Sequence, residues 1–121
     1  MFEISVEDTF AAGHALRGYR GKCEKVHGHN YKVQVSVEGA KLGQAGLLMD
    51  FVELKRLLHT VMDRLDHEFL NDVAPFTAVN PTAENMAKYF HDEIARALPP
   101  NVRLASVKIW ETDTSTATYR P

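Results

Sequence analysis

The fold is decided by residues 27–38, which read HGHNYKVQVSVE. From Tyr31 onward, apolar residues alternate strictly with polar ones, and this period of two is typical of a half-buried β-strand. His27 and His29 share the parity of Tyr31 and of the three valines that follow it. If the strand is regular back to His27, both imidazoles emerge on the apolar face of the sheet.

Three further strands and two helices are predicted from the same kind of pattern. Alternation and β-branched or aromatic residues predict strands at residues 2–6, 31–38, 102–111 and 116–120, with a turn at 112–115. Capping residues and apolar periodicity predict amphipathic helices from Asp50 to Leu65 and from Asn80 to the Pro99-Pro100 pair. The order ββααββ predicts an α+β fold, in which a four-stranded antiparallel sheet carries both helices on one face.

Composition narrows the class of protein. The chain has 121 residues, with 14 Lys and Arg, 16 Asp and Glu, one cysteine and a formal net charge of -2. We expect a single domain over residues 1–121, large enough to form a core without a disulfide or a structural metal. The near-neutral charge argues against a nucleic-acid-binding protein. No apolar stretch approaches the roughly 18 residues of a membrane span, and the lone cysteine fits a reducing compartment, so a cytoplasmic protein is expected.

The histidines predict a metal site. His14 has the parity of the apolar residues in the first strand, so it is expected to face the same side as His27 and His29. Three imidazoles without a nearby fourth thiolate are typical of a catalytic zinc with an open coordination position. The alternative is that these are core or turn histidines satisfied by backbone groups. His59 and His91 lie among charged residues of the two helices and are expected to be solvated.

Four further residues are candidates for catalysis. Cys23 lies in a cationic loop before His27, and such surroundings favour the reactive thiolate, although a lone cysteine can also be inert packing. Asp66 can set the tautomer and basicity of His67, with local charge capping as the simpler alternative. Glu111 continues the inward parity of its strand, unless the strand ends before it and the carboxylate is solvated.

Together these residues resemble the 6-pyruvoyl-tetrahydropterin synthase family, and within it the bacterial branch of 6-carboxy-5,6,7,8-tetrahydropterin synthases. The resemblance runs along nearly the whole chain. It is carried by residues 10–14 (FAAGH), 23–29 (CEKVHGH), 49–51 (MDF), 65–67 (LDH), 80–85 (NPTAEN) and 110–112 (WET). The Cys-x3-His-Gly-His spacing is the most discriminating of these motifs, because the animal enzymes place more residues between the cysteine and the His-Gly-His segment.

The resemblance implies a role for each candidate residue. His14, His27 and His29 match the zinc ligands of the family. Cys23 matches the proton-abstracting thiolate, and Asp66 with His67 matches the proton relay. Glu111 matches the carboxylate that binds the pterin. The cations of the loop, Arg17, Arg20, Lys22 and Lys25, are weak candidates for triphosphate contacts, since they can equally be a solvated surface.

The resemblance also implies the assembly and the reaction. The family has the tunnelling fold, in which three subunits join their sheets into a barrel and two trimers stack into a hexamer. The open edges of a lone four-stranded sheet independently favour a homo-oligomer. The implied reaction converts 7,8-dihydroneopterin triphosphate to 6-carboxy-5,6,7,8-tetrahydropterin, with loss of acetaldehyde and triphosphate, in queuosine biosynthesis. The alternatives are 6-pyruvoyl-tetrahydropterin synthase activity on the same substrate, or a pterin-binding or metal-binding module without turnover.

Overall fold

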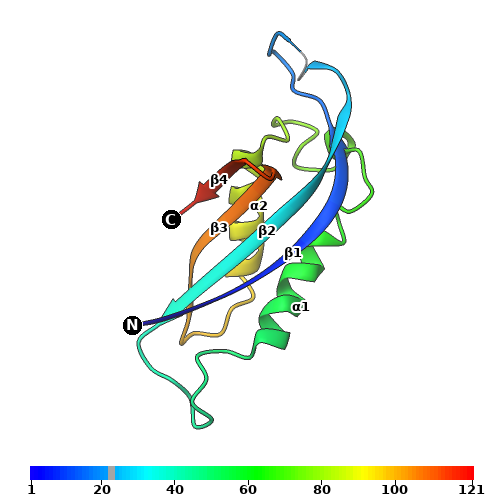
Figure 1. The fold of residues 1–121 in the computed structure, drawn as a ribbon. Coiled ribbons are helices and arrows are strands. Elements are labelled where there is room, and N and C mark those ends of the chain that lie inside the picture. The colour runs from blue at the N-terminus through cyan, green and yellow to red at the C-terminus, as the bar shows by residue number, and fades with distance from the viewer. Residues whose placement is uncertain (22–23) are drawn as a thin grey trace.

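The alternating residues in the first part of the chain form two long strands that pair along their whole length. The computed structural model describes residues 1–21 and 24–121. Its elements are β1 (Phe2–His14), β2 (His27–Gly39), α1 (Phe51–Met62), a short 3-10 helix (Leu70–Asp72), α2 (Ala83–Ala95), β3 (Arg103–Thr112) and β4 (Ser115–Tyr119). The strands form one antiparallel sheet in the order β1-β2-β3-β4, with both helices on the same face (Figure 1). The predicted α+β architecture is therefore confirmed.

The pairing of β1 with β2 is regular from Phe2 opposite Gly39 to His14 opposite His27. No bulge interrupts this ladder, so the parity predicted for His14 holds over the full strand. β1 extends beyond the predicted strand at residues 2–6. The apolar alternation is broken at Asp8, a polar residue at an inward position, so the sequence pattern does not indicate the rest of the strand. The structure accommodates Asp8 by pairing its Oδ2 atom with Nε2 of His59 on α1, at 2.7 Å.

The two helices begin where their capping residues predict. The Asp50 side chain accepts a hydrogen bond from the backbone of Val52 at the start of α1, and the Thr82 side chain accepts one from Asn85 at the start of α2. Both helices end earlier than predicted, at Met62 and Ala95. As a result, residues 65–67 lie in a turn beyond α1 and not on the helix itself.

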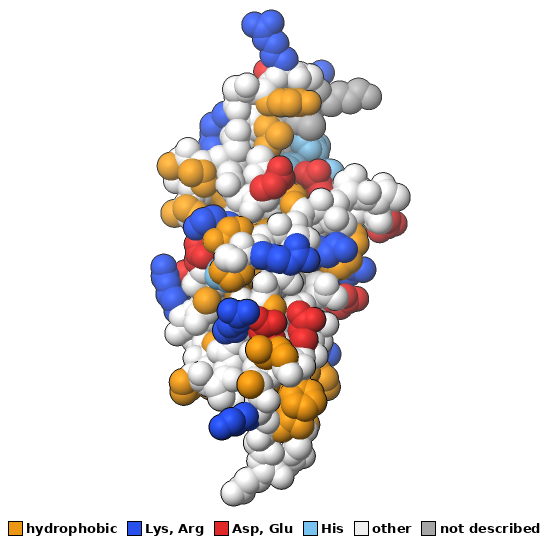
Figure 2. Space-filling model, turned by 90° about the vertical axis from the view of Figure 1, so that its left-hand side faces the viewer, with side chains coloured by type: hydrophobic (Ala, Val, Ile, Leu, Met, Phe, Trp, Pro, Cys, Tyr) orange, Lys and Arg blue, Asp and Glu red, His pale blue; other side chains and the backbone are white. Residues whose placement is uncertain are grey.

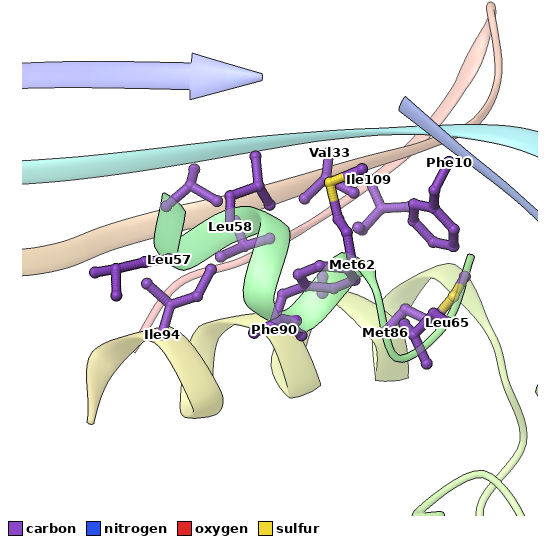
Figure 3. Close-up of a cluster of buried hydrophobic side chains, with 14 of the residues drawn as sticks. Phe10, Val33, Leu57, Leu58, Met62, Leu65, Met86, Phe90, Ile94 and Ile109 are labelled. Carbon is purple, nitrogen blue, oxygen red and sulfur yellow. The ribbon is translucent and has the colours of Figure 1, made fainter. Parts of the chain in front are cut away.

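The core lies between the sheet and the helix pair. In Figure 3 Val33 and Ile109 of the sheet face Leu58 of α1 and Phe90 of α2, and all four side chains are completely buried. Burying a side chain of this kind contributes about 1.5–3 kcal/mol. The apolar core of the described residues includes none of the histidines.

One surface prediction is wrong. His91 is only 9% exposed, and its ring packs edge-on against Tyr119 of β4 with the ring centroids 4.8 Å apart. The reason is that α2 covers both β3 and β4, so its buried face is wider than the apolar stripe of its sequence. His59 is 49% exposed, as predicted. On the face drawn in Figure 2, basic and acidic side chains are interspersed.

The open edges of the sheet are β1 and β4. Near the end of β1, the outer edge is covered by the segment after α1, where His67 donates its backbone N–H to Ala11 and Gly13 donates to Glu68. Over residues 2–10 the outer edge of β1 pairs with no other strand of the described part of the chain. No helix among the described residues is long and apolar enough to cross a membrane.

Candidate metal centre and active site

Three imidazoles meet at the end of the β1–β2 ladder. His14 and His27 are direct cross-strand partners, and His29 lies on the same face two residues further along β2. One ring nitrogen from each residue lies within 4.8 Å of those of the other two. His14 is 1% exposed, while His27 and His29 are partly exposed. The register of two regular strands is therefore sufficient to assemble the cluster.

The hydrogen bonds of two imidazoles determine which of their ring nitrogens carries the proton. Nδ1 of His14 lies 2.7 Å from the carbonyl oxygen of Pro81, and Nδ1 of His27 lies 2.7 Å from that of Lys25. A carbonyl can only accept, so each Nδ1 carries the proton, and in the neutral imidazole Nε2 then carries a lone pair. These two Nε2 atoms are 2.9 Å apart. Nε2 of His29 is buried without a hydrogen-bond partner in the described chain.

Converging lone pairs repel one another unless a cation lies among them. Burial lowers the pKa of His14 and of His29, which favours the neutral, metal-binding form, although the nearby Glu111 carboxylate opposes this shift in both residues. The Pro81 and Lys25 carbonyls orient the first two rings, as is common for histidine ligands of metals. The donor set and its orientation therefore fit zinc bound by His14, His27 and His29. The alternative of three histidines satisfied by backbone groups leaves the Nε2 atoms unexplained.

Glu111 reaches the same cluster from β3. Its Oε1 atom lies 3.3 Å from Nε2 of His14 and 3.6 Å from Nε2 of His29, and its side chain is 33% exposed. The carboxylate therefore faces inward, as its parity predicts, and is neither fully buried nor fully solvated. The position allows it to contact both the metal site and a ligand that enters from solvent.

Asp66 and His67 form a pair at the edge of β1. Oδ1 of Asp66 accepts a hydrogen bond from the backbone of Ala11 at 3.0 Å and lies 3.0 Å from Nδ1 of His67. The Asp66 carboxylate is thus held by the strand and not by a helix end, contrary to the charge-capping alternative. His67 has a φ of 61° and an 83% exposed side chain. Such a backbone conformation is uncommon for residues other than glycine and is often found at functional sites.

His67 also lines a hollow of about 570 Å³ together with His29 and Phe69. The strands that form its floor carry Gly13 opposite Gly28, so no side chain projects from them at that position. The hollow provides space for a ligand of the size of a pterin. The structure therefore brings His67 and His29, one of the three clustered histidines, to a common cavity.

The pH dependence of stability should reflect the Asp66 contact. The backbone N–H of Ala11, and after it His67, lowers the pKa of the Asp66 carboxyl. The unfolded value is about 3.9. Because the pKa of Asp66 is lower in the folded than in the unfolded protein, the ionised carboxylate stabilises the fold at pH values above the unfolded pKa. This stabilisation is lost as the pH falls through the folded pKa. We expect the free energy of unfolding in urea to fall less between about pH 6 and about pH 3 for Asp66→Asn than for the wild type.

A matched control for this measurement is Asp113→Asn, in the exposed turn between β3 and β4. It should keep the acid sensitivity of the wild type. If Asp66→Asn keeps it as well, the carboxylate does not contribute through the bond to Ala11.

Arg17, in the cationic loop that follows β1, has a structural function. The Arg17 guanidinium donates hydrogen bonds to the backbone carbonyls of Asn71, Phe76 and Val79, and so fastens residues 71–80 to the end of β1. Arg17 is therefore engaged with the protein, which weakens the interpretation of it as a triphosphate contact. Arg20 and Lys25 are exposed. Lys22 and Cys23, the candidate proton-abstracting thiol, lie outside the described residues.

Two contributors to the site were missed by sequence reasoning. Pro81 acts through its carbonyl, and no side-chain pattern indicates a backbone acceptor. Tyr31 is completely buried beside the cluster, with ring centroids 5.8 Å from His14 and 5.3 Å from His29. Burial raises the pKa of its hydroxyl, which is therefore neutral at any physiological pH. The parity of Tyr31 with the histidines is a signal that could have identified it.

Comparisons with known proteins identify the family. A family model described as 6-pyruvoyl tetrahydropterin synthase matches residues 3–121. The chain is 31% identical to 6-carboxy-5,6,7,8-tetrahydropterin synthase of Haemophilus influenzae, covering 99% of each chain. It is 40% identical to human 6-pyruvoyl tetrahydrobiopterin synthase, covering 98% of this chain and 90% of the human one. The structure of 6-pyruvoyl tetrahydropterin synthase from Caenorhabditis elegans superposes with a TM-score of 0.90 at 30% identity, covering 99% and 95% of the two chains.

The tunnelling fold and the histidine centre define a class of lyases that act on pterins. This chain belongs to the 6-pyruvoyl tetrahydropterin synthase family.

Proposed function

We propose that the protein is a zinc-dependent 6-carboxy-5,6,7,8-tetrahydropterin synthase of queuosine biosynthesis. It would convert 7,8-dihydroneopterin triphosphate and water to 6-carboxy-5,6,7,8-tetrahydropterin, acetaldehyde and triphosphate. The observation that carries this proposal is the convergence of three Nε2 atoms, two of them 2.9 Å apart, beside the Glu111 carboxylate. The Haemophilus influenzae relative bears the name of this activity and covers the whole chain.

Each residue has a part that follows from its chemistry. Zinc bound by the three imidazoles would act as a Lewis acid that makes the C–H bonds beside the substrate's hydroxyls more acidic. The thiolate of Cys23 accepts a proton from such a carbon. His67 donates or shuttles protons, and Asp66, whose Oδ1 lies 3.0 Å from Nδ1 of His67, orients the ring. Glu111 binds the 2-amino group and N3–H of the pterin through two charge-assisted hydrogen bonds.

We also propose that residues 1–121 act as one domain of a homo-oligomer, in which three sheets join into a barrel and two such trimers stack into a hexamer. The open outer edge of β1 and the short edge strand β4 support this assembly. The exposed position of His67 suits an active site shared between neighbouring subunits. The single cysteine suits a reducing compartment, and we place the reaction in the cytoplasm.

A second candidate is 6-pyruvoyl-tetrahydropterin synthase activity, which the 40% identity to the human enzyme favours. Incubation of the zinc-loaded protein with 7,8-dihydroneopterin triphosphate, followed by mass spectrometry, separates the two. We expect 6-carboxytetrahydropterin together with acetaldehyde. Formation of 6-pyruvoyl-tetrahydropterin alone would favour the second candidate, and absence of any product would favour a binding module.

A further inference from the structure

The distances around Glu111 are those of a metal ligand. Bonds of about 2.0–2.1 Å to a tetrahedral zinc place any two ligand atoms about 3.3 Å from each other. Oε1 of Glu111 lies 3.3 Å from Nε2 of His14 and 3.6 Å from Nε2 of His29, which matches two edges of such a tetrahedron. Binding of the pterin alone does not require the Glu111 carboxylate to lie at this spacing from the imidazole nitrogens.

A direct hydrogen bond does not explain the contact with His14. The Nδ1 atom of His14 already carries the proton that is donated to Pro81, so neutral His14 has no proton on Nε2 to give to Glu111. Nε2 of His29 is buried without a hydrogen-bond partner, although Oε1 of Glu111 is its neighbour at 3.6 Å. The carboxylate oxygen thus lies beside the lone pair of His14 and the unpartnered Nε2 of His29, an arrangement that a shared cation stabilises.

Glu111 also lies at an irregularity of the sheet and beside a hollow. The pairing of β3 with β4 shifts register between Trp110 and Thr112, so Glu111 lies at an irregularity in the ladder. Such irregularities often redirect a side chain next to an active site. Glu111 borders a hollow of about 400 Å³, formed by the start of α2 and by β4. The 33% exposed side chain of Glu111 therefore lies between the histidines and a hollow open to solvent.

We propose that Glu111 is the fourth ligand of the metal before substrate binds, and that it leaves the metal when the pterin arrives. In the resting protein the carboxylate closes the position that the substrate side chain later takes. Once released, the same carboxylate is available for the pterin ring. The first half of this proposal concerns only the metal and the free protein, whereas the release step rests on the proposed function.

Zinc affinity in the absence of any pterin tests the first half. Metal-free protein is titrated with zinc in competition with a chromophoric chelator, using the wild type, Glu111→Gln, Glu111→Ala and Glu84→Gln. Glu84 borders the same hollow and serves as the matched control. We expect both Glu111 variants to bind zinc at least about 10–100-fold more weakly, the range seen even for losses in the shell around metal ligands, and Glu84→Gln to bind it as the wild type does. Circular dichroism establishes that the variants are folded.

Cobalt substitution gives the second readout. The visible absorption of a cobalt-loaded protein depends on the number and type of ligands, so Glu111→Ala should change the spectrum. Adding neopterin to the cobalt-loaded wild type should also change it, because Glu111 is displaced. Unchanged zinc affinity and an unchanged cobalt spectrum in both Glu111 variants would overturn the proposal. This result would leave the proposed reaction intact, because that reaction is tested by its product.

Discussion

Replacing His27 with Ala is expected to yield a folded protein that retains no zinc and has no measurable synthase activity. Nε2 of His27 lies 2.9 Å from Nε2 of His14, so its loss leaves at most two imidazoles at the centre. Even with the Glu111 carboxylate, the centre then lacks one of the four ligands of the proposed resting site, which should weaken zinc binding strongly. The fold should survive because the apolar layer of Figure 3 lies between the sheet and the helices and does not include His27.

Zinc content by elemental analysis and helix content by far-UV circular dichroism, measured on the same sample, test this prediction. His59→Ala is the matched control, since it removes an imidazole that is 49% exposed and pairs with Asp8 away from the centre. That variant should keep its zinc and its activity. Unfolding of the His27→Ala protein would show instead that the metal is structural, and retained stoichiometric zinc would show that the ligand assignment is wrong.

Cys23→Ala is expected to lower turnover by about 10²–10⁴-fold, the usual contribution of a positioned acid or base, while zinc content stays at the wild-type level. The reason is that the thiolate is the proposed proton acceptor but not one of the zinc ligands. Cys23→Ser should be nearly as inactive, because a serine hydroxyl is far less acidic than a thiol. Rates of product formation are measured with the zinc-loaded variants and normalised to metal content.

The non-catalytic alternative makes the opposite prediction for the thiol. If the protein only binds a pterin or stores a metal, Cys23→Ala changes neither product formation nor ligand binding. If Cys23→Ala loses zinc together with activity, the role of Cys23 as a proton acceptor outside the metal centre is also contradicted, since the thiol would then be a metal ligand.

Most of the fold follows from local patterns in the sequence. The alternation in residues 31–38 is strict, so the strand, its buried face and the parity of His27 and His29 could be predicted together. The strand ending at His14 was harder to delimit, because Asp8 interrupts the apolar face and gains its partner, His59, only through tertiary contact. The turn between β3 and β4 was located correctly by its run of Thr, Asp and Ser residues.

Sequence patterns do not indicate contacts with backbone atoms that are distant in the chain, nor how many strands a helix covers. The carbonyl of Pro81 orients His14 across 67 positions of the chain, and Arg17 binds carbonyls more than 50 positions away. A backbone carbonyl that accepts such a hydrogen bond does not affect the periodicity of the side chains. The charged sequence neighbours of His91 predict a solvated side chain, whereas the packing of its ring against Tyr119 of β4 buries it.

The direct opposition of His14 and His27 limits how the chain can change in evolution. Because side chains on a strand point alternately to the two faces, inserting or deleting one residue within either strand would turn an imidazole away from its partners. Between His14 and His27, length changes that preserve the centre must therefore fall in residues 15–26, which connect the two strands. Related chains can be expected to differ in length at this connection while keeping the two strands free of gaps.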